Sequence, residues 1–312
     1  MKNYTSINDI DNINSWIDEA KEIKANPLVN KELGKDKTLG LLFFNSSLRT
    51  RLSTQKAALN LGMDPIVMNV SGDAWGIEFG DGTVMNGNTA EHIKEAAAVV
   101  SQYCDVIAVR AFPSLTDKEK DESEHVLNSF IEFASVPIVS MESATGHPLQ
   151  GLTDAITIAE STTKKRPKVV LSWAPHIKAL PHAVGNSFVQ AMQKMDVDFV
   201  IANPEGYDLN PAITKDTPIY HNQKEAFKDA DFVYTKNWSS YEEYGKVLNT
   251  DPSWMITKEK IDEAKFMHCL PVRRNLVVED AVLDSDASLV IEQANNRTYA
   301  AQLVLKKIIE KL

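Results

Sequence analysis

The chain has 312 residues, with 33 Lys and Arg against 43 Asp and Glu, so its formal net charge is −10. This length is enough for two domains of ordinary size, each with its own core. The acidic balance argues against a nucleic-acid partner, which would need a basic surface, so any anion site must be a local group of Arg and Lys. No apolar stretch approaches the ~20 residues of a membrane span and no leader pattern is present, so we expect a cytoplasmic protein without membrane contact.

Helical and strand patterns alternate along the chain, as they do in α/β proteins. An amphipathic helix is predicted over residues 10–23, and the chain closes with a helix that follows residue 292. We expect doubly wound parallel sheets. Short apolar runs predict strands at 39–44, 66–70, 105–109, 136–140, 168–173, 198–202, 232–235, 265–269 and 289–292. Intervening helices are predicted at 47–61, 91–102, 184–195 and 223–230.

The segment 47–50, Ser-Leu-Arg-Thr, falls where the first strand gives way to a helix. Free N–H groups at a helix N-terminus favour an anion, and here hydroxyls and a guanidinium add charge-assisted bonds at the same point. The segment therefore has the outline of a phosphate site. Taken alone, the same residues are more typical of an ordinary N-cap serine beside surface arginines, and the motifs further along the chain reverse that preference.

Further polar residues follow the predicted strands, and ligands of open parallel sheets bind beyond the carboxyl ends of their strands. By this rule Arg110, His176, Asn203 and Lys236 face a crevice. The connection 141–154 adds a carboxylate, an imidazole and an amide, a set suited to polarising a carbonyl group. These three are Glu142, His147 and Gln150. Arg297, in the opening turn of the last helix, would add a cation if that helix returns to the first domain.

Two features allow more than one interpretation. Cys269 could be a thiol nucleophile, a metal ligand or a small buried hydrophobe, and the metal is the weakest choice because no second Cys or His has zinc-like spacing. We therefore expect no metal and no cofactor. The Gly- and Asp-rich stretch 71–88 is predicted to be a loop, and its Trp75 either covers a site or interface or folds back onto its own domain.

Several motifs together resemble the carbamoyltransferases that act on ornithine-like amines. They keep the order of that family over about the whole chain, and they are Ser47–Thr50, His147–Gln150 with Leu152 and Asp154, His268–Pro271 and Asn296–Arg297. The resemblance implies one domain from 1–143 plus 292–312 that binds carbamoyl phosphate, and another from 144–291 that binds the amino acid. It also implies a homotrimer with active sites at the subunit boundary and a last helix that packs back on the first domain.

Carried over residue by residue, the resemblance gives a set of contacts to carbamoyl phosphate. The set is Ser47, Leu48, Arg49, Thr50, Trp75, Arg110, His147, Gln150, Cys269, Leu270 and Arg297, with Trp75 reaching a neighbouring subunit's site. Arg49, His147, Gln150 and Cys269 would be catalytic, the thiol by positioning the reactants and not by attack. The nucleophile would be the deprotonated side-chain amine of the substrate.

One segment departs from ordinary ornithine carbamoyltransferases. Their Asp-x-Trp-x-Ser-Met-Gly segment holds a free α-amino group, whereas residues 234–240 here read Tyr-Thr-Lys-Asn-Trp-Ser-Ser. The resemblance is therefore to the subgroup that uses N-acylornithines. It implies acylornithine contacts from Glu142, His176, Lys236, Ala90, Arg273 and Arg274. In that subgroup the segment 176–182 belongs to a loop through which the chain is knotted, an exception to the usual rule.

The acyl group is predicted from two positions. Acetylornithine users carry Glu at the position of Ala90 and Lys at that of Val277, and succinylornithine users carry Pro at the former, so Ala90 matches neither but brings no repelling carboxylate. A succinyl carboxylate would need cations or donors such as His176, Lys178, Arg273 or Arg274. We predict carbamoyl transfer to N-succinyl-L-ornithine in arginine biosynthesis, with N-acetyl-L-ornithine as the alternative. Ornithine, aspartate and a non-catalytic anion-binding relative are weaker alternatives.

Overall fold

The chain folds around two parallel sheets. The computed structural model describes residues 1–312, apart from the side chain of Ser71. The first sheet has the order β2-β1-β5-β6 and the second β11-β10-β7-β8-β9. The first comprises β1 (Thr38–Phe43), β2 (Asp64–Asn69), β5 (Val106–Arg110) and β6 (Ile138–Glu142). The second comprises β7 (Lys168–Trp173), β8 (Asp198–Ala202), β9 (Ile219–Tyr220), β10 (Phe232–Lys236) and β11 (Lys265–Met267). The prediction of a two-domain α/β fold is confirmed.

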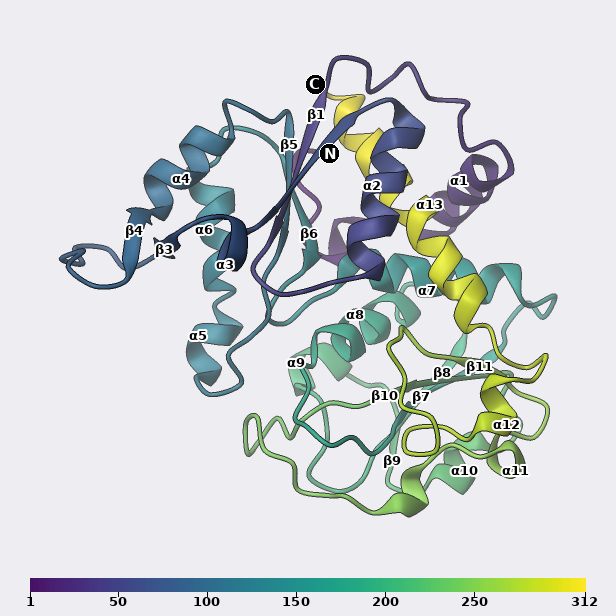
Figure 1. The fold of residues 1–312 in the computed structure, drawn as a ribbon. Coiled ribbons are helices and arrows are strands. Elements are labelled where there is room, and N and C mark those ends of the chain that lie inside the picture. The colour runs from purple at the N-terminus through teal and green to yellow at the C-terminus, as the bar shows by residue number, and fades with distance from the viewer.

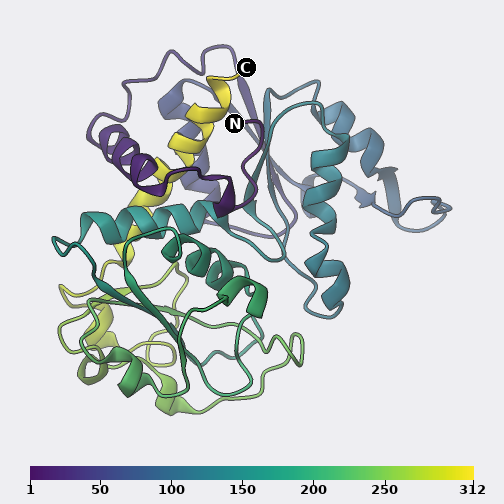
Figure 2. The same ribbon diagram turned by 180° about the vertical axis from the view of Figure 1, so that it is seen from behind.

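Helices flank both sheets (Figures 1 and 2). The longer ones are α1 (Ile13–Ala25), α2 (Arg49–Leu61), α4 (Ile93–Val100), α6 (His125–Phe133), α7 (Pro148–Glu160), α8 (Ala183–Met192) and α13 (Val290–Ile309). The short α-helices are α3 (Val70–Asp73), α5 (Lys118–Glu122), α9 (Pro211–Thr214), α10 (Gln223–Phe227), α11 (Lys258–Ile261) and α12 (Asp280–Leu283). Two 3₁₀ turns, η1 (Ile7–Asp9) and η2 (Pro252–Trp254), complete the set. None of the helices in the described part of the chain is long and apolar enough to cross a bilayer.

Burial on both faces explains why the strands read as continuous apolar runs. In β1, Leu39 and Leu41 pack into the core that faces α1, α7 and α13. The next residue, Leu42, packs into the core under α4 and α6 on the opposite face. Successive side chains of a strand point to opposite faces, so a strand covered on both sides must be apolar throughout. This double covering makes the sheet edge, where the strands end, the available place for a polar site.

The last helix returns to the first domain, as the sequence predicted. Helix α13 lies beside α2 and also packs on α1 and α7 (Figure 1). Their contact includes a buried hydrogen bond of 2.9 Å from Asn60 Nδ2 to Gln302 Oε1. Because α7 touches α13, α1 and α8, it joins the two halves of the molecule. The domain boundaries at residues 143 and 292 stay predictions, as does the knot.

A second contact joins the domains at α5. Lys118 Nζ lies 3.5 Å from the ring centroid of Tyr241 and donates to its carbonyl oxygen at 3.1 Å. Tyr241 and Tyr244 donate their hydroxyl groups to Glu122 and Asp121 at 2.8 and 2.9 Å. Residues 241–244 follow β10 closely, so this contact ties the carboxyl end of a second-domain strand to the first domain.

Two predictions of local structure were wrong. Residues 289–292 open α13 and its N-cap instead of forming a strand, because a short apolar run does not distinguish a strand from a buried helix segment. The stretch 71–88 is not a plain loop, since it contains most of α3 and also β3 (Gly76–Glu78), which pairs with β4 (Thr89–His92). The side chain of Ser71 lies outside the described part of the structure.

Gly151 provides a test of the packing between α7 and α8. A Cβ atom there would lie 2.7 Å from the carbonyl oxygen of Ser187 and 2.9 Å from Ile7 Cδ1. Alanine normally favours a helix over glycine by ~1 kcal/mol, but this clash should outweigh that gain and lower the free energy of unfolding by ~1–3 kcal/mol. Chemical denaturation of Gly151→Ala measures the change.

Gly185→Ala is the matched control for this substitution. Gly185 is also a buried helical glycine, but its added Cβ would meet the flexible side chain of Leu209 at 3.3 Å and Trp238 Cε3 at an ordinary contact distance of 3.8 Å. We expect its unfolding midpoint to stay near that of the wild type. A Gly151→Ala midpoint equal to that of the control would contradict the close approach of the two helices.

Candidate active site

The first predicted motif lies where β1 ends. Helix α2 begins at Arg49, and no side chain caps its N-terminus, so Ser47 and Leu48 precede the helix instead of forming its first turn. Thr50 is buried, and burial lowers the pKa of Arg49, whose guanidinium has no hydrogen-bond or ion-pair partner among the described residues. Backbone N–H groups and an unpaired cation therefore point to one place, as a phosphate site requires.

Arg110 and Glu142 end the neighbouring strands and face each other in register. Arg110 donates from Nε and Nη2 to Glu142 Oε2 at 3.2 and 3.1 Å, and from Nη1 to the carbonyl oxygens of Asn45 and Ser46. Burial raises the pKa of Glu142, even though Arg110, Lys236 and Arg297 act to lower it. Arg110 therefore holds in place the turn that leads from β1 into α2.

His147 is the N-cap of α7 and is buried. Its Nε2 lies 3.7 Å from Glu142 Oε2, its backbone N–H donates to Ser187 Oγ at 2.8 Å, and its Nδ1 has no partner among the described residues. Burial, with the charges of Arg297 and Arg110 nearby, holds the pKa of His147 well below its usual value. The ring is therefore neutral at neutral pH and carries a single N–H for donation.

Arg297 joins three distant segments of the chain. Its Nη2 donates to Thr50 Oγ1 at 2.6 Å, and its Nη1 donates to Gln150 Oε1. These bonds connect α13 to the start of α2 and to the first turns of α7. Arg297 is itself buried, and its Nε has no partner within the described residues. Three of the four sequence motifs thus meet at one guanidinium.

The fourth motif follows β11. Cys269 is buried, and burial raises the pKa of its thiol, which argues against a thiolate nucleophile. The backbone N–H of Leu270 donates to His268 Nδ1 at 2.9 Å, and Leu270 has a φ of 57°, in the left-handed region. The charge of Cys269, when ionised, would influence both Arg49 and Arg297, which places the thiol near the other motifs.

A group of cations lies beside this cluster in the second domain. Lys236 ends β10, is partly buried, and its Nζ has no hydrogen-bond or ion-pair partner among the described residues. Burial lowers the pKa of His176, and the charges of Lys236, Arg273 and Lys178 lower it further. Arg273 Nε also lies 3.3 Å from His176 Nε2. We call these four residues the cationic group, in which His176, because of its lowered pKa, contributes a neutral ring and not a charge; the group contains no carboxylate.

Three predicted residues are not brought to the cluster within this chain. Arg274 is exposed and pairs with Asp280 and Asp284 at 2.8 and 2.7 Å, so its donors are already taken. Trp75 is 59% exposed and donates from Nε1 to Glu91 Oε2 at 2.7 Å, which excludes burial in the core of its own domain. Ala90 is exposed in β4, and the β3–β4 arm projects away from the second domain (Figures 1 and 2).

The sequence assigned no role to two residues that reach this cluster. Asp154 accepts hydrogen bonds from Gln150 and Gln293, both at 2.7 Å. The spacing of four residues from Gln150 within one helix could have indicated this contact for Asp154. For Gln293, on α13, no sequence signal existed, because the contact depends on how the last helix packs. No three His, Cys, Asp or Glu side chains within the described residues are arranged to hold a metal ion.

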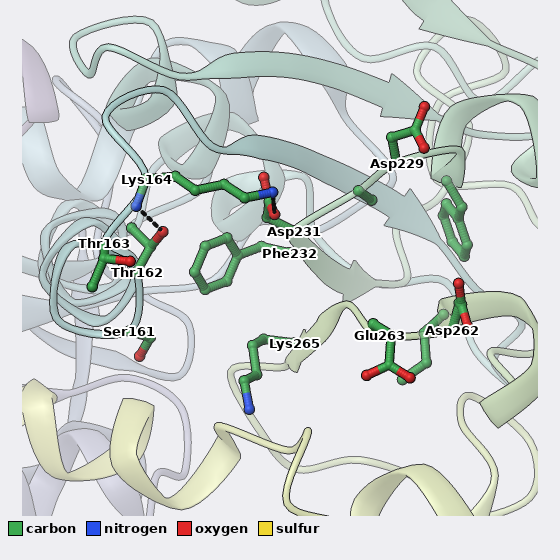
Figure 3. Close-up of a pocket in the computed structure, with 13 residues that line it drawn as sticks. Ser161, Thr162, Thr163, Lys164, Asp229, Asp231, Phe232, Asp262, Glu263 and Lys265 are labelled. Atoms are coloured by element: carbon green, nitrogen blue, oxygen red, sulfur yellow. Dashed lines mark hydrogen bonds and ion pairs between the residues drawn. The ribbon is translucent and has the colours of Figure 1, made fainter.

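A pocket elsewhere on the second domain is separate from the candidate active site. It lies at the amino ends of β7, β10 and β11, where Lys164 points toward Asp231, and Lys265 also borders it (Figure 3). His176, Lys236 and Cys269 follow the carboxyl ends of the same strands. Because the two edges of a sheet are separated by the strand length, this pocket does not belong to the cluster.

The chain is similar to known carbamoyltransferases. A protein of Bacteroides thetaiotaomicron named N-succinylornithine carbamoyltransferase is 47% identical over the full length of both chains. One of Xanthomonas campestris named N-acetylornithine carbamoyltransferase is 35% identical, covering 95% of this chain and 94% of its own. A crystal structure of an N-acetyl-L-ornithine transcarbamylase, a glutamate-to-serine mutant complexed with carbamyl phosphate and N-succinyl-L-norvaline, has a TM-score of 0.93 and 32% identity, covering 99% of this chain and 100% of that chain.

Two family descriptions match consecutive parts of the sequence. Residues 2–160 match the carbamoyl-P binding domain of aspartate/ornithine carbamoyltransferases, and residues 181–308 match their Asp/Orn binding domain. The first range contains the Ser47 and His147 motifs, and the second contains Lys236, Cys269 and Arg297. The chain belongs to the aspartate/ornithine carbamoyltransferase family.

Proposed function

We propose that this protein transfers the carbamoyl group of carbamoyl phosphate to the side-chain amine of N-succinyl-L-ornithine. The products are N-succinyl-L-citrulline and phosphate, and the setting is cytoplasmic arginine biosynthesis. The observation that carries the substrate assignment is the cationic group beside the cluster of motifs. The full-length similarity to a protein named for this activity supports it.

Carbamoyl phosphate would bind where the four motifs meet. The N-terminal amides of α2 would hold its phosphate, together with the unpaired Arg49 and the bridging Arg297. Neutral His147 would donate its N–H to the carbonyl oxygen, where negative charge grows as the carbon becomes tetrahedral. Gln150 Oε1, which already accepts from Arg297, would accept from the carbamoyl amide. Cys269, a protonated thiol, would position the two reactants.

The reaction needs no covalent enzyme intermediate. The neutral side-chain amine attacks the carbamoyl carbon, a C–N bond forms, and the C–O bond to phosphate breaks with its electron pair passing to the phosphate oxygen. The proton that the amine loses can be taken up by the departing phosphate, so the step balances without a cofactor. The residues above contribute by orienting the reactants and by stabilising charge that develops on oxygen.

The acylated amino acid would bind on the second domain. Lys236 would pair with the α-carboxylate, and His176, Lys178 and Arg273 would meet the succinyl carboxylate. Glu142 would face the acylated substrate across the crevice. An acetyl group would leave the charges of Lys178 and Arg273 without an anion. Arg274 is the least suited of the predicted contacts, because two aspartates already occupy it.

We further propose a homotrimer in which Trp75 serves a neighbouring subunit. The indole is exposed on the projecting β3–β4 arm, and the exposed side chains of Leu48, just before α2, and Leu52, on α2, add apolar surface close to the phosphate motif. Apolar surface of this kind is typical of an interface between subunits. Ala90 lies on the same arm, so it would approach the substrate of the neighbour as well.

The first test is substrate preference. Product formation from carbamoyl phosphate is measured with ornithine, N-acetylornithine and N-succinylornithine at equal concentrations. We expect the succinyl compound to give a kcat/KM at least about tenfold above that of the acetyl compound, because it alone supplies a second carboxylate. Preference for the acetyl compound would refute the acyl assignment, and preference for free ornithine would refute the whole substrate assignment.

The second test concerns Ala90. In Ala90→Glu a carboxylate would face the succinyl carboxylate, so kcat/KM for N-succinylornithine should fall at least about tenfold relative to N-acetylornithine. Ala90→Gln is the matched control, since it has the same size without the charge and should change the ratio much less. An unchanged ratio in the Glu variant would place Ala90 outside the substrate site.

The third test is subunit complementation. Arg49→Ala and Trp75→Ala should each abolish most turnover while leaving the fold intact. When the two variants are unfolded, mixed in equal amounts and refolded, random trimers should regain roughly a quarter of wild-type activity, because some sites then combine both native residues. Each variant refolded alone is the control. Activity in the mixture no higher than in these controls would exclude a site shared between subunits.

A further inference from the structure

Asp154 occupies an unusual position for a carboxylate. It is fully buried in α7, and its Oδ1 accepts from both Gln150 Nε2 and Gln293 Nε2 at 2.7 Å. Gln293 Oε1 in turn accepts the backbone N–H of His268 at 3.0 Å. A single carboxylate oxygen is therefore the shared acceptor for a side chain of the candidate site and for the support of the turn 268–270.

These bonds select one orientation for each amide. A glutamine side chain has a donor and an acceptor end of nearly equal shape, so only its partners decide which end faces which way. With Nε2 of Gln150 directed to Asp154, Oε1 faces Arg297. With Nε2 of Gln293 directed to Asp154, Oε1 faces His268. Without an acceptor at residue 154, neither orientation would be favoured in this way.

The burial of this carboxylate is unfavourable in itself. Burial raises the pKa of Asp154 to about 7, although the two amide donors and the nearby charge of Arg297 lower it. No cation bonds to it within the described residues; its Oδ2 makes no close hydrogen bond there, although the hydroxyl of Tyr234 also acts to lower the pKa of Asp154. An apolar side chain of similar volume would avoid this penalty. A contribution to packing alone therefore does not account for a carboxylate at this position.

We infer that Asp154 is a positioning residue for the carbamoyl transfer. It acts mainly by fixing the amide of Gln150, and it also supports the turn at Cys269 and Leu270 through Gln293. The inference rests on the proposed function, because Gln150 is there assigned to the carbamoyl amide. It adds a residue that touches no substrate and acts only through those that do.

A double-mutant cycle tests this. Steady-state kinetics with carbamoyl phosphate and N-succinylornithine are compared for the wild type, Asp154→Ala, Gln150→Ala and the double variant. If Asp154 acts largely through Gln150, Asp154→Ala should lower kcat by about 10²-fold in the wild type but only a few-fold in the Gln150→Ala background. KM for N-succinylornithine should change little. Equal losses of kcat in both backgrounds would refute the inference.

Two more variants keep the test decisive if Asp154→Ala folds poorly. Asp154→Asn retains an acceptor at the position of Oδ1 and should keep most of the kcat, whereas Asp154→Leu retains the volume without the acceptor and should lose as much as alanine. An Asn variant as impaired as the Leu variant, with both folded, would overturn the inference. Thr153→Val is the matched control: it removes the adjacent buried hydroxyl, which bonds only to Leu149 O, and should leave kcat unchanged.

The cycle also separates this inference from the proposed function. If the wild type does not carbamoylate N-succinylornithine, the proposed function fails. If the wild type is active but Asp154→Ala and Gln150→Ala act independently, only the positioning role of Asp154 fails.

Discussion

The candidate site depends on the hydrogen bonds of one buried group, the guanidinium of Arg297. Its bonds to Thr50 and Gln150 can form only if the last helix crosses back to the first domain and lies against α2 and α7. Helices α2, α7 and α13 start at widely separated points of the sequence, yet the opening turns of α2 and α7 converge on Arg297, the eighth residue of α13. The packing of one long helix thus decides whether the motifs make one site or several unrelated features.

The candidate site is rich in cations, although the chain as a whole is acidic. The protein has a net charge of −10, but Arg49, Arg297 and Lys236 lie together in this site. Beside them, the buried carboxylate of Glu142 forms an ion pair, and its partner is Arg110. Buried cations without matching anions are unfavourable unless a ligand supplies the negative charge. The proposed anionic substrates would supply it. Burial, together with the nearby charges of Arg297 and Arg110, keeps His147 neutral, as the proposed donation to a carbonyl requires.

Much of the fold was predictable because its signals are local. Strands covered on both faces read as apolar runs, and β1, β5, β7, β8 and β10 lie where those runs predicted them. The prediction failed where a short apolar run had two solutions, as at 289–292, and where pairing depends on a partner strand, as in β3 and β4. The two-residue strand β9 carried too little pattern to be recognised.

The sequence by itself determined the family and the chemistry of the motifs, since the functional groups of residues such as Arg49, His147 and Gln150 follow from their identity. It also determined the absence of an ammonium partner at Lys236. Only the tertiary structure decided which of these groups meet and how each is oriented. The bridge at Arg297, the cationic group around His176 and the shared acceptor at Asp154 all join residues from separate elements, and their geometry follows from helix and sheet packing, which no local pattern encodes.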